Sequence, residues 1–433
     1  MLHVGFGTAD ITPAEGMSII GGFIPKPGKG VRDKCWAVAC VVYDGTNAVA
    51  LVGTDTLVIG KNTVLNARRM IQKDTKIPGE NVLVGASHTH SGGPAGEGPG
   101  REENAEYLDK LAKGIHSAVF SAWHSLHAAE IGIGVGKEDS ISFNRRFLMR
   151  NGREITHPGK PGTPHHAEIV RPAGPIDPNV GVLAARDPKG KITGIVVNFA
   201  CHSTVVGGDL FSPDYPGYLR KHLQARYGDI PVVFLLGACG DITQVNNLSP
   251  GRESGPEYAD MMGMKLAAVA QQTIGRMTWL KEAPVAATTE TAVLHYRAEP
   301  DLDAERPPFG LGSGQEEVYE RGRKVVADLR AKHPKGIAAE VQGIRIGPLG
   351  IVSNGAEYFC DYALRIKQCS PFATTFFASL ANEAFGYIAT AQAFMGGGYE
   401  VRTGRASQFS VDAGQRLLES AVKALGKVAP PKG

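Results

Sequence analysis

The chain has 433 residues, of which 42% are hydrophobic and 21% charged, and its formal net charge is +3. This length and apolar content are enough for a large buried core, and the balanced charge gives no indication of nucleic-acid binding. No apolar run approaches the roughly 20 residues of a membrane span, and no signal peptide is visible, so we expect a cytoplasmic protein.

The first third of the chain alternates expected strands with an expected helix. Residues 4–12 read as a strand, and residues 35–43 and 48–54 read as two strands joined by Asp44-Gly45, a strong hairpin signal. Residues 61–74 carry apolar side chains at helical spacing.

The stretch 82–93 combines a buried strand with two histidines. Its apolar residues 82–86 lead into Ser87-His88-Thr89-His90 and a glycine-rich turn. Continued strand alternation would place His88 and His90 on the same side, roughly 6–7 Å apart. Two imidazoles at the end of a buried strand need partners, and a divalent metal or a polar substrate would supply them. The alternative is a pair of loop histidines bonded to backbone.

The periodicity changes twice after this stretch. Residues 103–126 form the clearest amphipathic helix, but between residues 136 and 179 no periodicity is visible. A segment of this length is too long for a plain connection, and it carries more arginine and lysine than acidic residues. We therefore expect a mildly cationic loop that faces the substrate.

Two further apolar strands end in polar residues. Residues 191–200 end in Cys201-His202, and residues 231–236 end in Gly240-Asp241-Ile242-Thr243. Ligands of open α/β sheets bind outside the carboxyl ends of strands, so these loops and the one after residue 86 are expected to meet at one site.

The remaining chain continues the alternation of helices and strands. Helices are expected at residues 256–274 and 315–333, strands at 285–296 and 372–380, a hairpin at 340–353 and a last helix ending near 425. The sequence thus predicts an α/β fold with a mixed β-sheet core, flanking helices and a metal site at the strand carboxyl ends. No linker or repeat is visible, so residues 1–433 are expected to form a single domain.

The six cysteines form no Cys-x-x-Cys pair, and four of them lie in or beside apolar runs. They are interpreted mainly as buried thiols, with a Cys35–Cys40 or Cys360–Cys369 bridge as the alternative.

Common catalytic motifs are absent: the sequence has no His-Glu-x-x-His, no Gly-x-Ser-x-Gly and no phosphate-binding loop. What remains is a set of histidines, a glutamate and a tyrosine near strand ends. Three nitrogen or oxygen ligands with an open position are what a hydrolytic zinc ion requires.

Several motifs resemble the neutral (alkaline, non-lysosomal) ceramidase family. The most specific is Ser87-His88-Thr89-His90-Ser91-Gly92 after an apolar strand, together with residues 7–12, Gly-Thr-Ala-Asp-Ile-Thr. Shorter motifs follow in the family's order, at Asn144-Arg145, residues 198–202, Gly240-Asp241-Ile242-Thr243, Ala356-Glu357-Tyr358 and residues 386–390.

The resemblance implies a zinc ion on four residues and cleavage of an amide bond in an N-acyl compound. The implied zinc ligands are His88, His202, Glu357 and Tyr387. The residues implied in catalysis are His90, Arg145, Thr243 and Tyr399.

This sequence departs from the family pattern at several points. It ends where ceramidases continue into an immunoglobulin-like domain, Thr243 replaces a serine, and Phe394 stands where the family has a tyrosine, while Tyr399 is kept.

We therefore expect a zinc-dependent hydrolase of a small molecule, in which a metal-activated water splits an amide. One alternative is hydrolysis of an ester or glycosidic bond in a polar, carbohydrate-derived substrate, and another is a metal-stabilised binding protein without turnover. The sequence does not determine the oligomeric state.

Overall fold

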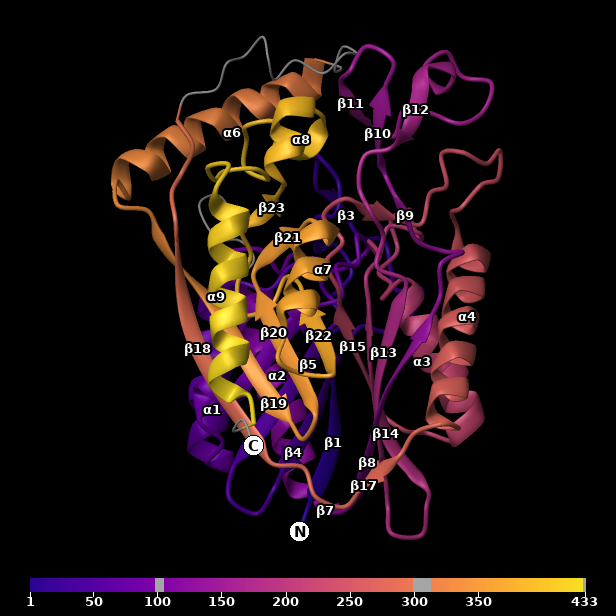
Figure 1. The fold of residues 1–433 in the computed structure, drawn as a ribbon, viewed down its shortest axis with the longest axis vertical. Coiled ribbons are helices and arrows are strands. Elements are labelled where there is room, and N and C mark those ends of the chain that lie inside the picture. Colours follow the sequence, from indigo (N-terminus) through magenta and orange to yellow (C-terminus); the bar gives the residue numbers. More distant parts are fainter. Residues whose placement is uncertain (98–104, 299–312, 431–433) are drawn as a thin grey trace.

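The computed structural model describes residues 1–97, 105–298 and 313–430. Three β-sheets face a common interior in it, and each carries a pair of helices on its outer side (Figure 1). The parallel strand pairs β5–β6, β14–β15 and β20–β22 occur within otherwise mostly antiparallel sheets. The predicted α/β fold with a mixed sheet core and flanking helices is confirmed.

The first sheet has the strand order β6-β5-β4-β1-β7. Its strands are β1 His3–Asp10, β4 Trp36–Tyr43, β5 Ala48–Thr54, β6 Val82–Ala86 and β7 His127–Ala128. The predicted hairpin is the antiparallel pair β4–β5. Helices α1 (Lys61–Thr75) and α2 (Ala105–His124) pack on the outer face; the predicted start of the second helix at Glu103 lies outside the described residues.

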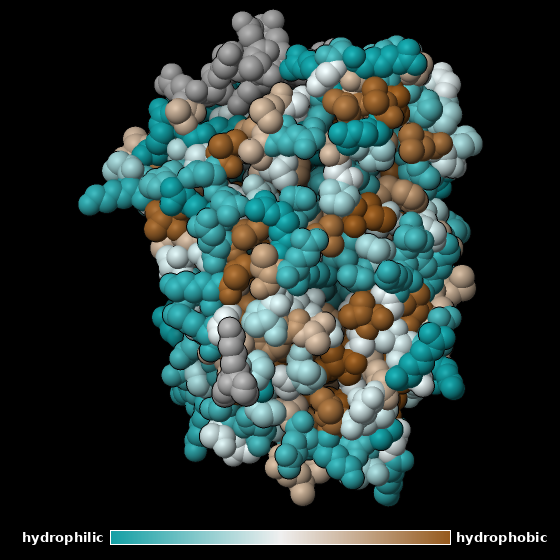
Figure 2. All heavy atoms as spheres, viewed as in Figure 1, coloured by the Kyte–Doolittle hydropathy of each residue, from teal (hydrophilic) through white to brown (hydrophobic). Residues whose placement is uncertain are grey.

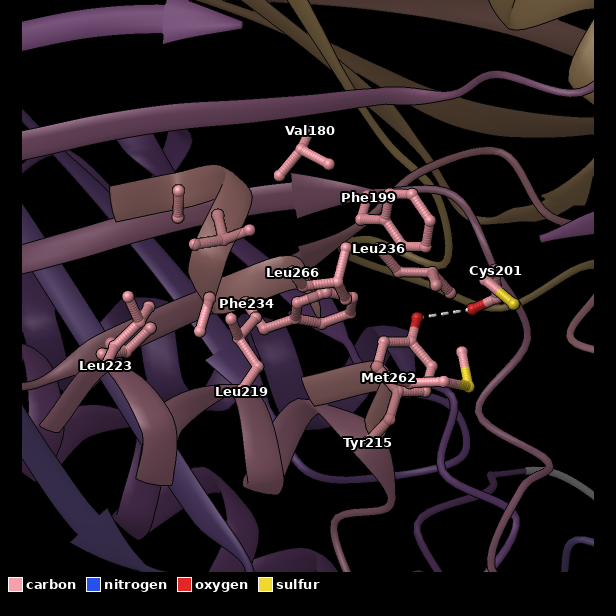
Figure 3. Close-up of a cluster of buried hydrophobic side chains, with 14 of the residues drawn as sticks. Val180, Phe199, Cys201, Tyr215, Leu219, Leu223, Phe234, Leu236, Met262 and Leu266 are labelled. Atoms are coloured by element: carbon pink, nitrogen blue, oxygen red, sulfur yellow. Dashed lines mark hydrogen bonds between the residues drawn. The ribbon is translucent and has the colours of Figure 1, made fainter. Parts of the chain in front are cut away.

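The second sheet has the order β15-β14-β13-β8-β17. Its strands are β8 Glu130–Lys137, β13 Asn179–Arg186, β14 Ile192–Phe199, β15 Val232–Leu236 and β17 Trp279–Leu280. Helices α3 (Tyr215–Tyr227) and α4 (Pro256–Ile274) cover it. Figure 3 shows strand residues such as Phe199 and Phe234 packing against Leu219 and Leu266 of these helices.

The third sheet has the order β18-β19-β20-β22. Its strands are β18 Val285–Leu294, β19 Ile337–Ile346, β20 Leu349–Asn354 and β22 Thr374–Ala378. Helices α7 (Cys360–Cys369) and α9 (Ala413–Val428) cover its outer face, and α6 (Ser313–Lys332) and α8 (Ala391–Gly396) lie at the upper end in Figure 1.

Strand alternation explains how three sheets can share one buried interior and also pack against helices on their outer faces. Along β13, Val182 and Ala184 belong to the outer core under α3 and α4, while Leu183 and Ala185 belong to the core shared by the sheets. Period-two alternation thus gives each strand two apolar faces. Because both faces of these strands are apolar, polar residues are expected at the carboxyl ends of the parallel pairs.

The segment 136–179, predicted to be a substrate-facing loop, contains regular strands. The end of β8, the two-residue strand β9 (Phe143–Asn144) and a three-stranded sheet lie there, the sheet formed by β10 Arg146–Met149, β11 Glu154–Thr156 and β12 Ile169–Pro172. This sheet has its own apolar cluster around Phe147 and Ile155. Its strands are too short to show a period in the sequence.

The cysteines are free thiols, as the main interpretation predicted, and all except Cys369 are buried. No helix within the described residues is both long and apolar enough to span a membrane. On the face shown in Figure 2, apolar side chains form separate groups among hydrophilic ones.

Candidate metal centre

The first two histidines follow β6, but the strand ends before them. His88 has a backbone φ of 63°, so strand alternation does not continue through it as the sequence interpretation assumed. The left-handed turn brings the Nε2 atoms of His88 and His90 to 3.4 Å. The two rings are therefore closer than the 6–7 Å expected of a regular strand.

The third histidine follows β14 and is tied to the first two. The backbone N–H of His90 donates to the carbonyl of Ser203 at 3.0 Å, and the Ser203 hydroxyl donates to the carbonyl of Ser87 at 2.8 Å. The hydroxyl of Tyr215 donates a hydrogen bond of 2.8 Å to the carbonyl of Cys201, the residue before His202 (Figure 3). Both histidine segments are thus fixed by buried hydrogen bonds.

Glu357 and Tyr387 come from the third part of the chain. They are direct register partners in the parallel strands β21 (Ala356–Tyr358) and β23 (Gly386–Ile388). The Tyr387 ring stacks near His202, with 6.5 Å between ring centroids. The structure therefore brings the four residues implied as zinc ligands into one neighbourhood, with His90 beside them.

The polar atoms of this cluster converge closely. Glu357 Oε2 lies 3.3 Å from the Nε2 of His88 and 3.4 Å from the Nε2 of His202. The ligand atoms of the three histidines all lie within 4.8 Å of one another. For comparison, two ligands of a tetrahedral zinc ion at about 2.0–2.1 Å are about 3.3–3.4 Å apart.

The second ring nitrogen of each histidine fixes its tautomer. The Nδ1 atoms of His88, His90 and His202 contact the carbonyl oxygens of Leu57, Gly21 and Ile242. Since a carbonyl oxygen only accepts, each Nδ1 carries the proton and each Nε2 presents a lone pair.

The charges of the cluster match this assignment. Burial lowers the pKa of His90 well below its usual range, and burial together with the charge of Arg145 lowers the pKa of His202 to about 4. Burial alone raises the pKa of Glu357, but the charge and the N–H donors that His88 and His202 offer when protonated outweigh it and hold that pKa well below its usual range. A cation bound between neutral imidazoles would likewise favour the ionised carboxylate. Neutral imidazoles and an ionised carboxylate are the states in which these groups bind metals.

An unsatisfied carboxylate oxygen provides the test of whether a cation fits. Glu357 Oε2 is buried and has no hydrogen-bond partner among the described residues. The two Nε2 atoms that face it present lone pairs. In the part of the chain that the structure describes, the donor aimed at them is Arg145 Nη1, 3.5 Å from His202 Nε2. Buried acceptors that face one another are costly unless a cation lies between them. The residues present therefore fit a zinc ion.

Arg145 lies at the edge of this cluster, held on three sides. Its Nε donates to Glu400 at 2.8 Å, its Nη2 donates to the carbonyl of Gly240 at 2.7 Å, and its Nη1 is directed at His202. Its guanidinium lies over the rings of Tyr387 and Tyr399, 5.4 and 5.9 Å from their centroids. This leaves Nη1 as the donor directed toward the histidines.

Glu400 was not identified from the sequence. It is completely buried, and its second oxygen accepts from Arg146 Nη1 and from the hydroxyl of Thr156, both at 2.6 Å. Burial by itself raises the pKa of Glu400, but the charges of Arg146 and Arg145 lower it to about 2. No local motif distinguishes this glutamate, because its partners are far away in the chain.

The two aromatic positions singled out from the sequence have different surroundings. The Tyr399 ring packs edge-on against Tyr387, with 5.5 Å between centroids, and Phe23 packs against Tyr399 in turn. Phe394 on α8 instead lies under the guanidinium of Arg297 at 4.8 Å. Tyr399 is therefore the one that borders Tyr387.

Thr243 has a hydroxyl whose proton is already engaged. The side-chain amide of Gln244 donates to the carbonyls of Thr204 and Glu253, so its oxygen is free to accept. Thr243 Oγ1 donates to that oxygen at 3.1 Å. Asp241 of the same motif has a structural position, since it accepts from Asn144 and from the backbone of Cys360.

Comparisons with known proteins give a structural likeness and no sequence match. No protein-family model matches the sequence, and no curated protein matches it. A solved structure described as a ceramidase complexed with C2 superimposes with a TM-score of 0.75 at 19% identity, covering 100% of this chain and 76% of that one. The neutral ceramidase from Pseudomonas aeruginosa gives 0.72 at 20% identity with the same coverage. The chain therefore has the neutral ceramidase fold.

Proposed function

We propose that this protein is a zinc-dependent hydrolase that cleaves the amide bond of an N-acyl compound. The observation that carries the proposal is the buried, unpartnered Oε2 of Glu357 facing the lone pairs of His88 and His202. The neutral ceramidase fold supports amide chemistry, because the solved structures that share it are described as ceramidases.

The proposed zinc ligands are His88, His202, Glu357 and Tyr387. Zinc bound there would supply a Lewis acid that polarises the carbonyl group of the substrate. His90 is also close, because its Nε2 lies 3.4 Å from that of His88. Its neutral Nε2 is suited to accept the proton of the attacking water, and we assign it that role.

Arg145 and the tyrosines would act on the substrate carbonyl. The Nη1 group of Arg145 is fixed before substrate binds, so it can stabilise negative charge on the carbonyl oxygen without rearrangement. Tyr399 borders the same place and offers a phenolic proton, since burial raises its pKa to about 12. The hydroxyl of Thr243 donates to Gln244, so we assign it a supporting role and not that of a nucleophile.

The proposal is tested by turnover of a substrate panel. N-acyl amines, acyl sugars and glycosides are each offered to the protein as purified, after chelation, and after zinc is restored. We expect cleavage of N-acyl amines that disappears with the chelator and returns with zinc. Cleavage of esters or glycosides alone, or stoichiometric zinc without any turnover, would contradict the proposal.

A further inference from the structure

His157 is a histidine of the small sheet's loop that the proposed function does not use. It directly follows β11, and its backbone N–H donates to the carbonyl of Arg145 at 2.9 Å. It has a φ of 51° and precedes Pro158, a position where extended backbone is normally preferred. A strained backbone of this kind persists only when the surroundings hold it, and it is commonest at functional sites.

The tautomer of His157 is determined by Asn247. The Asn247 amide nitrogen donates to the carbonyl of Gly159 at 3.1 Å, which turns the amide oxygen toward His157. That oxygen lies 3.2 Å from His157 Nδ1. Because an amide oxygen only accepts, Nδ1 carries the proton and Nε2 presents a lone pair. Within the described residues, the ring's hydrogen bond is made by Nδ1, to Asn247, and Nε2 makes none.

The side chain of His157 is exposed to solvent and lies close enough to Arg145 to be affected by its charge. Desolvation and the charge of Arg145 together lower the pKa of His157 to about 4. The imidazole is therefore neutral at neutral pH, and a molecule in solvent can reach it next to Arg145.

The wall around His157 is rigid. Lys160 Nζ donates to the carbonyl of Asn246 at 2.8 Å and pairs with Glu253, and Asn247 itself is buried. These bonds join the loop of the small sheet to the segment that follows Thr243. An acceptor held in this way loses little freedom when a ligand binds.

We propose that His157 Nε2 accepts a hydrogen bond from a hydroxyl or N–H group of the substrate, which makes this side of the site selective for a polar substituent. The inference rests on the proposed function in placing the substrate beside Arg145. Arg145 then offers a donor and His157 an acceptor on one wall, a combination that a purely hydrocarbon group would leave unsatisfied.

Two non-cleavable probes that differ by one hydroxyl test the proposal. N-(2-hydroxyethyl)hexanesulfonamide and N-ethylhexanesulfonamide are titrated calorimetrically into the zinc-loaded protein at pH 7. We expect the hydroxylated probe to bind about tenfold more tightly to the wild type, as expected of one additional hydrogen bond. His157→Phe is expected to reduce this ratio to about one, and His157→Gln to keep part of it.

Two further variants separate this role from a structural one. Asn247→Leu leaves the imidazole in place but frees its tautomer, so it is expected to lower the ratio. His166→Phe, in the same loop, is the matched control and should leave the ratio unchanged. If His157→Phe does not fold, the affinity ratios of the two probes for His157→Gln and Asn247→Leu test the inference instead.

Equal affinity of the two probes for the wild type, no binding of either, or an unchanged ratio in His157→Phe would overturn the inference. Absence of amide turnover would overturn the proposed function alone, because the affinity ratio needs no turnover.

Discussion

Glu400 accepts a hydrogen bond from the Nε of Arg145 at 2.8 Å although the two residues are 255 positions apart in the chain. The same carboxylate pairs with Arg146, whose other nitrogen pairs with Glu154 at 2.7 Å. Glu400 therefore contacts the arginine beside the histidines directly, whereas Glu154 reaches it only through Arg146. This difference provides a matched pair of variants.

Glu400→Gln is expected to lower kcat about 10- to 100-fold, because it releases the Nε of Arg145 and misplaces the donor at Nη1. Zinc content should not change. Glu154→Gln also removes one partner of a buried arginine, so it should destabilise the fold by a similar amount, about 3–5 kcal/mol. Its kcat should stay within about threefold of the wild type. Equal kcat values for the two variants would show that Glu400 does not position Arg145.

Zinc content tests the ligand assignment most directly. Elemental analysis of protein purified without added metal is expected to show close to one zinc per chain, and His202→Ala should lose most of it because the Nε2 facing Glu357 is gone. His116→Ala is the control, since His116 pairs with Asp74 at 2.8 Å on the surface of α2. Full zinc in His202→Ala would remove His202 from the site.

The fourth ligand is tested by comparing Tyr387→Phe with His90→Ala. Tyr387 is the register partner of Glu357, and His90 Nε2 lies 3.4 Å from His88 Nε2, so both are candidates. If Tyr387 is the ligand, its variant should raise the zinc Kd by about tenfold or more in a chelator competition, and His90→Ala should do so less. Both should lose turnover. The opposite order of zinc affinities would make His90 the fourth ligand.

The sequence predicted the positions of the histidines better than their geometry. The strands that precede His88 and His202 are apolar runs, and the convergence of their carboxyl ends follows from a general property of α/β sheets. The left-handed backbone conformation at His88 cannot be recognised in the sequence, because glycine is the residue type that indicates such a conformation. The close approach of the two imidazoles was therefore not predictable.

Glycine-rich strands were not predicted from the sequence, for a different reason. β8 alternates isoleucine or valine with Gly132, Gly134 and Gly136, and a Cβ on these glycines would lie within 2.3–2.7 Å of side chains of α4 or of Met277 just beyond it. The glycines are thus required by a helix more than 100 residues later in the chain. Glu400 and its arginines illustrate the same limit, since only the folded chain brings them together.

Thr243→Val is expected to slow turnover without abolishing it. The hydroxyl donates to Gln244 Oε1, and Thr204 donates to the same oxygen at 2.9 Å, so the substitution weakens one wall of the site while leaving the histidines and Glu357 in place. Steady-state kinetics should show a loss of about tenfold or less. Detection of a covalent adduct on Thr243 by mass spectrometry during turnover would contradict the role assigned here.

Acid unfolding is expected to report on Glu400. Its pKa in the folded protein is about 2 against 4.5 for an unperturbed glutamate, because the charges of Arg146 and Arg145 outweigh the effect of burial. A depressed pKa contributes stability that is complete above about pH 4.5 and disappears as the pH falls through about 2; the difference corresponds to about 3 kcal/mol. Since a protonated glutamate resembles glutamine, the free energies of unfolding of the wild type and Glu400→Gln should differ at pH 7 and converge as the pH falls toward 2. Urea titrations at pH 7, 4 and 2.5 measure this, and a pH-independent difference would mean that Glu400 is not ionised in the fold.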